Sequence, residues 1–260
     1  MRIVLFFFFL LSVLVLTLPS CSKSDSTSIS NLEGSSGSIT RFAVYENHMY
    51  VLNSNEIQTF DLADRENPLL VHAIQTEYGL ETIFIYEGKA FLGARTGLYI
   101  LDLANPAEPV ILSEAIRSEV FFGGCDPVVV RDNYAFSTIK IIENICGNWN
   151  AESALIIYDV SDSSNPMEVA VRTLSEPNGL GILGDVLLVC DTGTDQLVAF
   201  DIGDPTDPVL LPNVTLPIMD PFDLIVDGDR VIVSTKTNFQ ILDASDLQNI
   251  TLIKTIAKGE

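Results

Sequence analysis

The sequence predicts an all-β fold, a β-propeller of five four-stranded blades. Five short apolar segments each end in an aspartate, at positions 61, 102, 159, 201 and 243. These aspartates lie 41, 57, 42 and 42 residues apart, so a unit of about 41–42 residues repeats five times with one insertion. An Asp-rich loop follows each segment, and no part of the chain has a convincing helical period. Repeats of this length built from short strands are typical of propellers.

Each repeat is interpreted as four strands, which the second repeat illustrates best. A two-residue turn such as Glu87-Gly88 joins the first two strands and is a strong hairpin signal. The Asp-rich loop joins the third strand to the fourth, where Asp and Asn side chains can hold the turn. Its last proline opens the fourth strand, which therefore has to be the outer edge of the blade. The four predicted strands are Thr82–Tyr86, Ala90–Gly93, Gly97–Leu103 and Val110–Ile116.

The strand ends resemble the LVIVD repeat family of bacterial and archaeal proteins, and Leu197-Val-Ala-Phe-Asp201 is similar to the motif that gives the family its name. The resemblance covers residues 39–260. It implies a propeller with a surface or envelope location and supplies no catalytic residues. We expect packing of the first blade against the fifth to close the ring, and the alternative is an incomplete ring that a partner completes.

The N-terminus predicts export and a lipid anchor. Residues 1–20 combine a basic start with an apolar run too short to span a membrane, which is typical of a secretory signal peptide. Leu18-Pro19-Ser20-Cys21 resembles a bacterial lipobox, in which Cys21 carries the lipid. Residues 21–38 are polar and rich in Ser and Gly, as expected for a flexible tether. We therefore divide the chain into a signal (1–20), a tether (21–38) and a propeller domain (39–260); a plain cleaved signal and an uncleaved anchor are the alternatives.

The net charge excludes one class of partner. The chain has 14 basic and 35 acidic residues and a formal charge of −21. Neutralising phosphates requires clustered Lys or Arg, so nucleic acid is not expected as a partner. Anionic lipid would repel the domain too, so membrane attachment depends on the lipid anchor alone.

The insertion, residues 140–153, lies between the second and third strands of the third repeat. It contains Cys146 and Trp149, and the loop that enters the same blade contains Phe121, Phe122 and Cys125. In an exported protein two cysteines brought together in this way are expected to be oxidised, so we predict a Cys125–Cys146 disulfide. The three aromatic residues predict an apolar binding patch; the alternative is that the insertion buries its own aromatics. Cys190 lies in an apolar run and is expected in the core.

A possible calcium site follows from aligning the first strands of the repeats. The alignment places Thr40, Glu81, Asp126, Asn178 and Phe222 in one column, with Asp223 one position later. Of these, Glu81, Asp126, Asn178 and Asp223 offer oxygen ligands of the kind that Ca²⁺ takes. Phe222 interrupts the column, and acidic turns are expected throughout a chain of this charge, so we expect no cofactor and keep Ca²⁺ as the alternative.

We therefore expect a non-catalytic binding module that is anchored at the bacterial outer membrane or cell surface and binds a protein or glycan of the cell envelope. No Ser-His-Asp arrangement, Cys-His pair or phosphate loop suggests catalytic residues. The main alternative is a calcium-dependent, lactonase-like hydrolase with its site at the mouth of the propeller channel. A third interpretation is a scaffold that binds through the sides of its blades.

Overall fold

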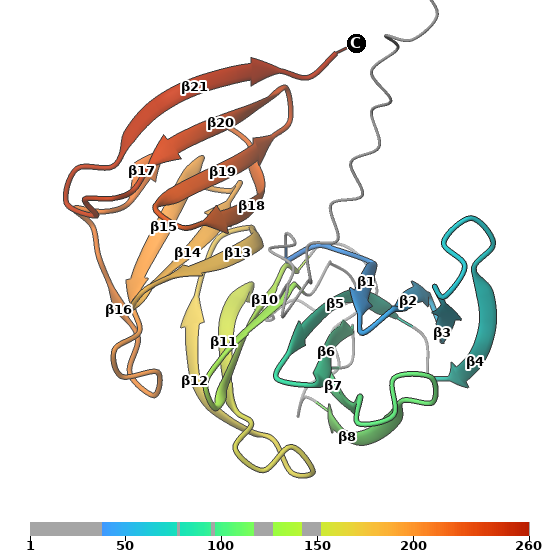
Figure 1. Cartoon of the computed structure of the whole chain (residues 1–260). Helices are drawn as coiled ribbons and strands as arrows, with labels where there is room; N and C mark the ends of the chain where they lie inside the picture. Colours follow the sequence, from blue (N-terminus) through green and yellow to red (C-terminus); the bar gives the residue numbers. More distant parts are fainter. Residues whose placement is uncertain (1–37, 77–78, 95–96, 117–126, 142–151, 260) are drawn as a thin grey trace, which may run out of the picture. The chain divides into compact units, whose positions relative to one another are not determined.

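The computed structural model describes residues 38–76, 79–94, 97–116, 127–141 and 152–259. Every regular element in these ranges is a β-strand, as predicted (Figure 1). The strands belong to one compact unit, Glu33–Glu260, and form five antiparallel sheets that we call blades 1 to 5 in chain order. Within the described ranges no helix is both long enough and apolar enough to cross a membrane.

In each blade the strands pair in chain order. Blade 1 contains β1 (Phe42–Tyr45), β2 (His48–Asn53), β3 (Glu56–Asp61) and β4 (Leu69–Gln75). Blade 2 contains β5 (Leu80–Tyr86), β6 (Lys89–Ala94), β7 (Gly97–Asp102) and β8 (Val110–Ile116). Blade 3 contains β9 (Val128–Arg131), β10 (Tyr134–Ile139), β11 (Ala154–Asp159) and β12 (Met167–Thr173). Blade 4 contains β13 (Pro177–Leu183), β14 (Val186–Asp191), β15 (Gln196–Asp201), β16 (Val209–Leu210) and β17 (Leu216–Pro217), and blade 5 contains β18 (Pro221–Asp227), β19 (Arg230–Thr235), β20 (Asn238–Asp243) and β21 (Thr251–Ala257).

The predicted strands of the second repeat agree with β5 to β8, and the third strand of every blade ends at the predicted aspartate. Blade 4 departs from the expected four strands because its outer strand is split into β16 and β17, which both pair with β15. Between them Thr215 Oγ1 accepts a hydrogen bond from the Ala199 N–H. A side chain thereby replaces one bond that a continuous outer strand would have made.

The predicted two-residue turns join the first and second strands of all five blades. The first residue of each turn has a positive φ, between 43° and 57°. This is the conformation that tight antiparallel hairpins require, because its twist matches that of the flanking strands. The turn residues with these φ values are Glu46, Glu87, Asp132, Gly184 and Gly228.

The Asp-rich loops are held by their own side chains, as predicted. At the end of the third strand an Asp Oδ1 accepts the N–H two residues later, for example from Ser161 to Asp159 at 2.9 Å. A second aspartate repeats this bond within the loop, from Ser164 to Asp162 at 3.0 Å. The hydroxyl and N–H of Ser161, both bonded to the carboxylate, lower the pKa of Asp159. Much of the acidity of the chain therefore holds turns together.

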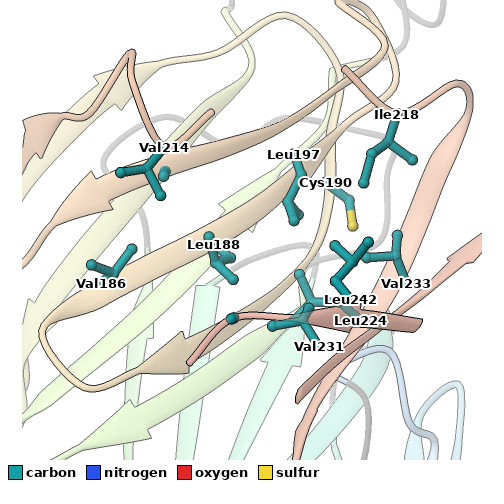
Figure 2. Packing of buried hydrophobic residues seen from close by; sticks show 12 residues of the cluster. Val186, Leu188, Cys190, Leu197, Val214, Ile218, Leu224, Val231, Val233 and Leu242 are labelled. Atoms are coloured by element: carbon teal, nitrogen blue, oxygen red, sulfur yellow. The ribbon is translucent and has the colours of Figure 1, made fainter. Parts of the chain in front are cut away.

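The core lies between neighbouring blades, in four apolar clusters. Figure 2 shows the cluster between blades 4 and 5, where Leu188, Cys190 and Leu197 lie opposite residues of blade 5. Those opposing residues are Leu224, Val231, Val233 and Leu242. Cys190 is fully buried, as predicted, and burial raises the pKa of its thiol. Blades 2 to 4 thus each present one apolar face to the preceding blade, the leading face, and one to the next blade, the trailing face; we use the same two names for the corresponding faces of blades 1 and 5.

Candidate interaction surfaces

The residues that precede β1 connect several blades at the end where the first strands begin, which we call the mouth. The buried Ser38 Oγ accepts a hydrogen bond from the N–H of Leu180 in blade 4 at 2.8 Å. It donates to Oδ1 of Asp223 in blade 5 at 3.1 Å. The N–H of Ile83 in blade 2 donates to the Thr40 carbonyl at 2.8 Å. We call residues 38–40 the clasp, because they join blades 2, 4 and 5.

Asp223 is the acidic residue to which the clasp is bonded. Burial raises the pKa of its carboxyl, and hydrogen bonds from the backbone of Leu224 and from the Ser38 side chain oppose the rise. Gly179 leaves the space for this carboxyl, because a Cβ at that position would lie 2.1 Å from Asp223 Oδ1. The clasp thus depends on a glycine in blade 4, an aspartate in blade 5 and a serine before blade 1.

A polar network joins blades 3 and 4 at the mouth. Thr138 Oγ1 donates to the Asn178 carbonyl at 2.6 Å, and the Asn178 amide donates to Thr192 Oγ1 at 3.0 Å. Lys140 Nζ lies 2.8 Å from Glu176 Oε2. The hydrogen bond and the charge of Lys140 lower the pKa of Glu176. The network fixes the base of the insertion, where the N–H of Ile141 donates to Ser153 Oγ at 3.0 Å.

The predicted calcium ligands are only partly within the described residues. Asn178 and Asp223 lie on neighbouring first strands, and both side chains make hydrogen bonds within the protein. Glu81 lies in β5 of blade 2 and has a polar interaction of its own, whereas Asp126 lies outside the described residues. Within the described ranges no three His, Cys, Asp or Glu side chains form a group that could hold a metal ion. Calcium binding stays a prediction that would need Asp126.

Other predicted site residues also lie outside the described ranges. They are the lipidation residue Cys21, the Cys125–Cys146 pair, and the aromatic residues Phe121, Phe122 and Trp149. The lipid anchor, the disulfide and the aromatic patch stay predictions.

The leading face of blade 1 is open, and this corrects the expectation that the first blade packs against the fifth to close the ring. Phe42 occupies the position of Ile83 in blade 2 and Leu224 in blade 5, because each pairs with the equivalent residue of its second strand. Leu224 is 2% exposed, Ile83 is 1% exposed, and Phe42 is 57% exposed. In the described residues the inner blades bury this position against a preceding blade, and blade 1 has none.

The trailing face of blade 5 is open in the same way. One position of the third strand is almost completely buried in blades 1 to 4, where its residue is at most 1% exposed; these residues are Ile57, Leu98, Leu155 and Leu197. The equivalent residue of blade 5 is Phe239, which is 39% exposed. The chain thus leaves open the two halves of one interface between blades.

A pocket of about 350 Å³ lies at the mouth end of the blade 5 face. Phe222, Ile232 and Phe239 give it apolar walls, and Ile39 and Thr40 of the clasp line its inner side. Lys258 borders the same face: its ammonium group lies 4.8 Å from the centre of the Phe239 ring and donates to Ser234 Oγ at 2.9 Å. The trailing face of blade 5 is therefore an apolar surface with a basic side chain at its margin.

Sequence reasoning gave the incomplete ring only as the alternative and named no residue of these end faces, although the signal was present in the repeats. The first and last repeats have apolar residues at the positions that the inner repeats bury, such as Phe42, Val44, Ile232 and Phe239. Comparing the repeats column by column would have shown that neither terminal repeat has a polar outer face. Repeat arrays usually protect their ends with polar capping repeats.

Comparisons with known proteins agree on the architecture. A family model for the LVIVD repeat matches residues 81–115 and 149–171. A candidate 6-phosphogluconolactonase from Bacteroides fragilis aligns with a TM-score of 0.62 and 11% identity, over 83% of this chain and 69% of that protein. A protein from Lactobacillus plantarum aligns with a TM-score of 0.61 and 13% identity, over 83% and 70%. No curated protein matches the sequence significantly.

A chain in a nidogen/laminin complex aligns with a TM-score of 0.54 and 15% identity, over 84% of this chain and 78% of that one. Likenesses at such low identity establish the fold and leave the activity open. The matched repeats, the five antiparallel blades and these structural neighbours agree with one another. The chain therefore has a β-propeller fold, and two of its segments, residues 81–115 and 149–171, match the LVIVD repeat.

Proposed function

We propose that this protein is an exported binding module without catalytic activity, anchored through a lipid on Cys21 at the bacterial outer membrane or cell surface, where it binds a protein or glycan of the cell envelope. The N-terminal signal and the lipobox-like segment support the location. The polar side chains described at the mouth are engaged in hydrogen bonds that join blades, which supports a structural role for them.

The two open end faces are the observation that carries this proposal. Large exposed apolar patches on soluble proteins mark interaction sites, because leaving them in water costs free energy. Phe42 and Val44 of blade 1 are both more than half exposed. The inner blades bury the position of Phe42 almost completely, so a partner that covers it would restore the packing found elsewhere in the chain.

The experiment is a capture assay with the full chain as bait and a solubilised extract of bacterial envelopes. Phe42→Asp places a charge on the open leading face. Met167→Asp is the matched control, because Met167 is 55% exposed on the outer strand β12 of an inner blade. We expect the partner to be lost with Phe42→Asp and kept with Met167→Asp; identical capture by both variants would contradict the proposal.

The insertion defines a second candidate surface on the same module. Its proposed contact residues are Phe121, Phe122 and Trp149, held by the Cys125–Cys146 disulfide. Deleting residues 141–152 in the same assay separates the two surfaces. A partner that is lost only with the deletion binds the insertion, and one that is lost only with Phe42→Asp binds the end face.

The alternative function is a calcium-dependent, lactonase-like hydrolase at the mouth, with Glu81, Asp126, Asn178 and Asp223 as ligands. The fold likeness to the candidate lactonase favours it, and so does the position of Asn178 and Asp223 on neighbouring strands. This alternative predicts that millimolar calcium raises the melting temperature of the chelator-treated protein, and that Asp126→Asn abolishes the rise. An unchanged melting temperature would count against it.

A further inference from the structure

We propose that the partner of the end faces is a second copy of this chain, and that the leading face of blade 1 in one copy packs on the trailing face of blade 5 in another. This inference rests on the proposed function, in which the end faces are the binding surfaces. It names the partner and the contact.

The four inner interfaces supply the template for this contact. In each of them the trailing face of one blade packs on the leading face of the next, and both faces use the same strand positions. At the interface of blades 4 and 5, Cys190 packs in one cluster with Leu224 and Val233 (Figure 2). Strand pairing identifies the equivalent residues of the two open faces. Ser234 in blade 5 corresponds to Cys190. Phe42 and Val51 in blade 1 correspond to Leu224 and Val233. The complement of each open face is therefore present on this chain.

Within one copy the two halves do not meet. The four pairs of successive blades are in contact through their first strands. In the described part of the chain, no pair of strands from blades 1 and 5 makes a comparable contact. At the mouth, Ser38 of the described residues before blade 1 donates a hydrogen bond to Asp223 of blade 5. A second copy can supply both missing halves at once, because blade 1 of each copy would cover blade 5 of the other.

At the inner interfaces, polar side chains of one blade bond to the Asp-rich loop of the next blade, and the proposed contact should contain an equivalent bond. Tyr50 Oη donates to the Pro106 carbonyl, and Ser113 Oγ donates to the Ser163 carbonyl. In each case a side chain of the trailing face reaches the Asp-rich loop of the next blade. Lys254 has the position of Ser113 in blade 5, because each pairs with the equivalent residue of the third strand.

The loop that Lys254 would reach in a second copy is the Asp-rich loop of blade 1. It contains Asp64 and Glu66, both exposed. Lys258 borders the mouth end of the trailing face of blade 5, and Glu56 lies at the same end of the leading face of blade 1. The chain has only 14 basic residues, and two of them lie where this contact would place carboxylates opposite them. Such charge complementarity fixes the register of an interface and speeds association.

The experiment uses two variants of the full chain, Phe42→Cys and Ser234→Cys. They are purified separately, mixed at equal concentration and treated with a short bismaleimide. The equivalence with Leu224 and Cys190 places the new thiols next to each other only across the proposed contact. The unmodified chain under the same treatment gives the background from its own cysteines, and Ser164→Cys, in an exposed loop of blade 3, replaces Ser234→Cys in a control mixture.

We expect a covalent dimer in the mixture of Phe42→Cys and Ser234→Cys, at least fivefold above the unmodified chain and above the Ser164→Cys mixture. Adding Lys254→Glu to the Ser234→Cys variant should reduce this yield, and the reduction should be smaller at high salt. A mixture that crosslinks no better than the control overturns the inference. The double variant, which contains Phe42→Cys and Ser234→Cys in one chain, is treated in the same way. A crosslink that forms only within this single chain overturns the inference too, because one copy would then close on itself.

The capture assay keeps this result separate from the proposed function. If Phe42→Asp releases an envelope partner and the mixture forms no crosslink, the end face binds a different protein and only the second-copy inference fails. If the crosslink forms, the mass of the unmodified chain by light scattering should double with rising concentration, and Phe42→Asp should keep it monomeric.

Discussion

The hydroxyl of Ser38 makes the most specific prediction, because it connects two blades through one buried and one partly buried hydrogen bond. Ser38→Ala removes the acceptor of the Leu180 N–H, at 2.8 Å, and a donor to Asp223 Oδ1, at 3.1 Å. A buried N–H left without a partner costs about 1–3 kcal/mol, and a hydrogen bond to a charged group contributes about 1.5–3 kcal/mol. The two bonds share one atom and are not additive, so we expect a loss of about 3 kcal/mol.

Thermal unfolding measures this loss. For a domain of this size a change of 1 kcal/mol shifts Tm by about 2–4 °C, so Ser38→Ala should lower Tm by roughly 6–12 °C. Amide exchange of Leu180 should accelerate as well, because its N–H loses its acceptor. Thr206→Ala is the control: Thr206 also donates to a carboxylate, that of Asp204 at 2.7 Å, but at an exposed site.

The control should change the stability by less than about 0.5 kcal/mol, as is usual for surface substitutions. If Ser38→Ala and Thr206→Ala unfold at the same temperature, the clasp does not hold blades 4 and 5 together.

Three further substitutions test other contacts. Burial raises the pKa of Asp223 above its value in the unfolded chain. The contribution of Asp223 to stability is therefore complete below the unfolded pKa and is lost as the pH rises through the folded pKa. Asp223→Asn should flatten the dependence of Tm on pH over that interval. Gly179→Ala should cost about 1–3 kcal/mol or more in chemical denaturation, because the new Cβ would lie 2.7 Å from the Asp223 Cα, whereas a Cβ at Gly259 meets nothing within 4 Å. Arg131→Ala removes hydrogen bonds from blade 3 to two groups of blade 4, the Ile202 carbonyl at 3.1 Å and the Asp185 carboxylate at 3.2 Å. It should lower the stability by about 1–2 kcal/mol in the same assay. Unchanged denaturation midpoints would contradict the values expected for Gly179→Ala and Arg131→Ala.

The fold within each blade could be predicted from the sequence because the interactions that define it are local. The turn at Glu87-Gly88 and the Asp159 loop are set by residues that are near neighbours in the chain. The same local reasoning placed Cys190 in the core, since it lies in a continuous apolar run. Five copies of these signals made the repeat visible without any tertiary information.

The contacts between blades could not be predicted in this way. Ser38 and Asp223 are 185 positions apart in the chain, and alignment of the repeats marked Asp223 as a potential ligand without indicating its partner. The column alignment was correct in placing Asn178 and Phe222 at one level. It contained no information on which neighbouring side chains fill the space beside them.

By itself, the sequence determined the blade: its strands, its turns, its acidic loops and the alternation that gives it two apolar faces. Only the tertiary structure decided whether the last blade meets the first, because that depends on the angles between successive sheets, which are set by packing across all four interfaces. Phe42 and Leu224 occupy the same position in their repeats, and one is 57% exposed while the other is 2% exposed. The difference between them is the presence of a preceding blade.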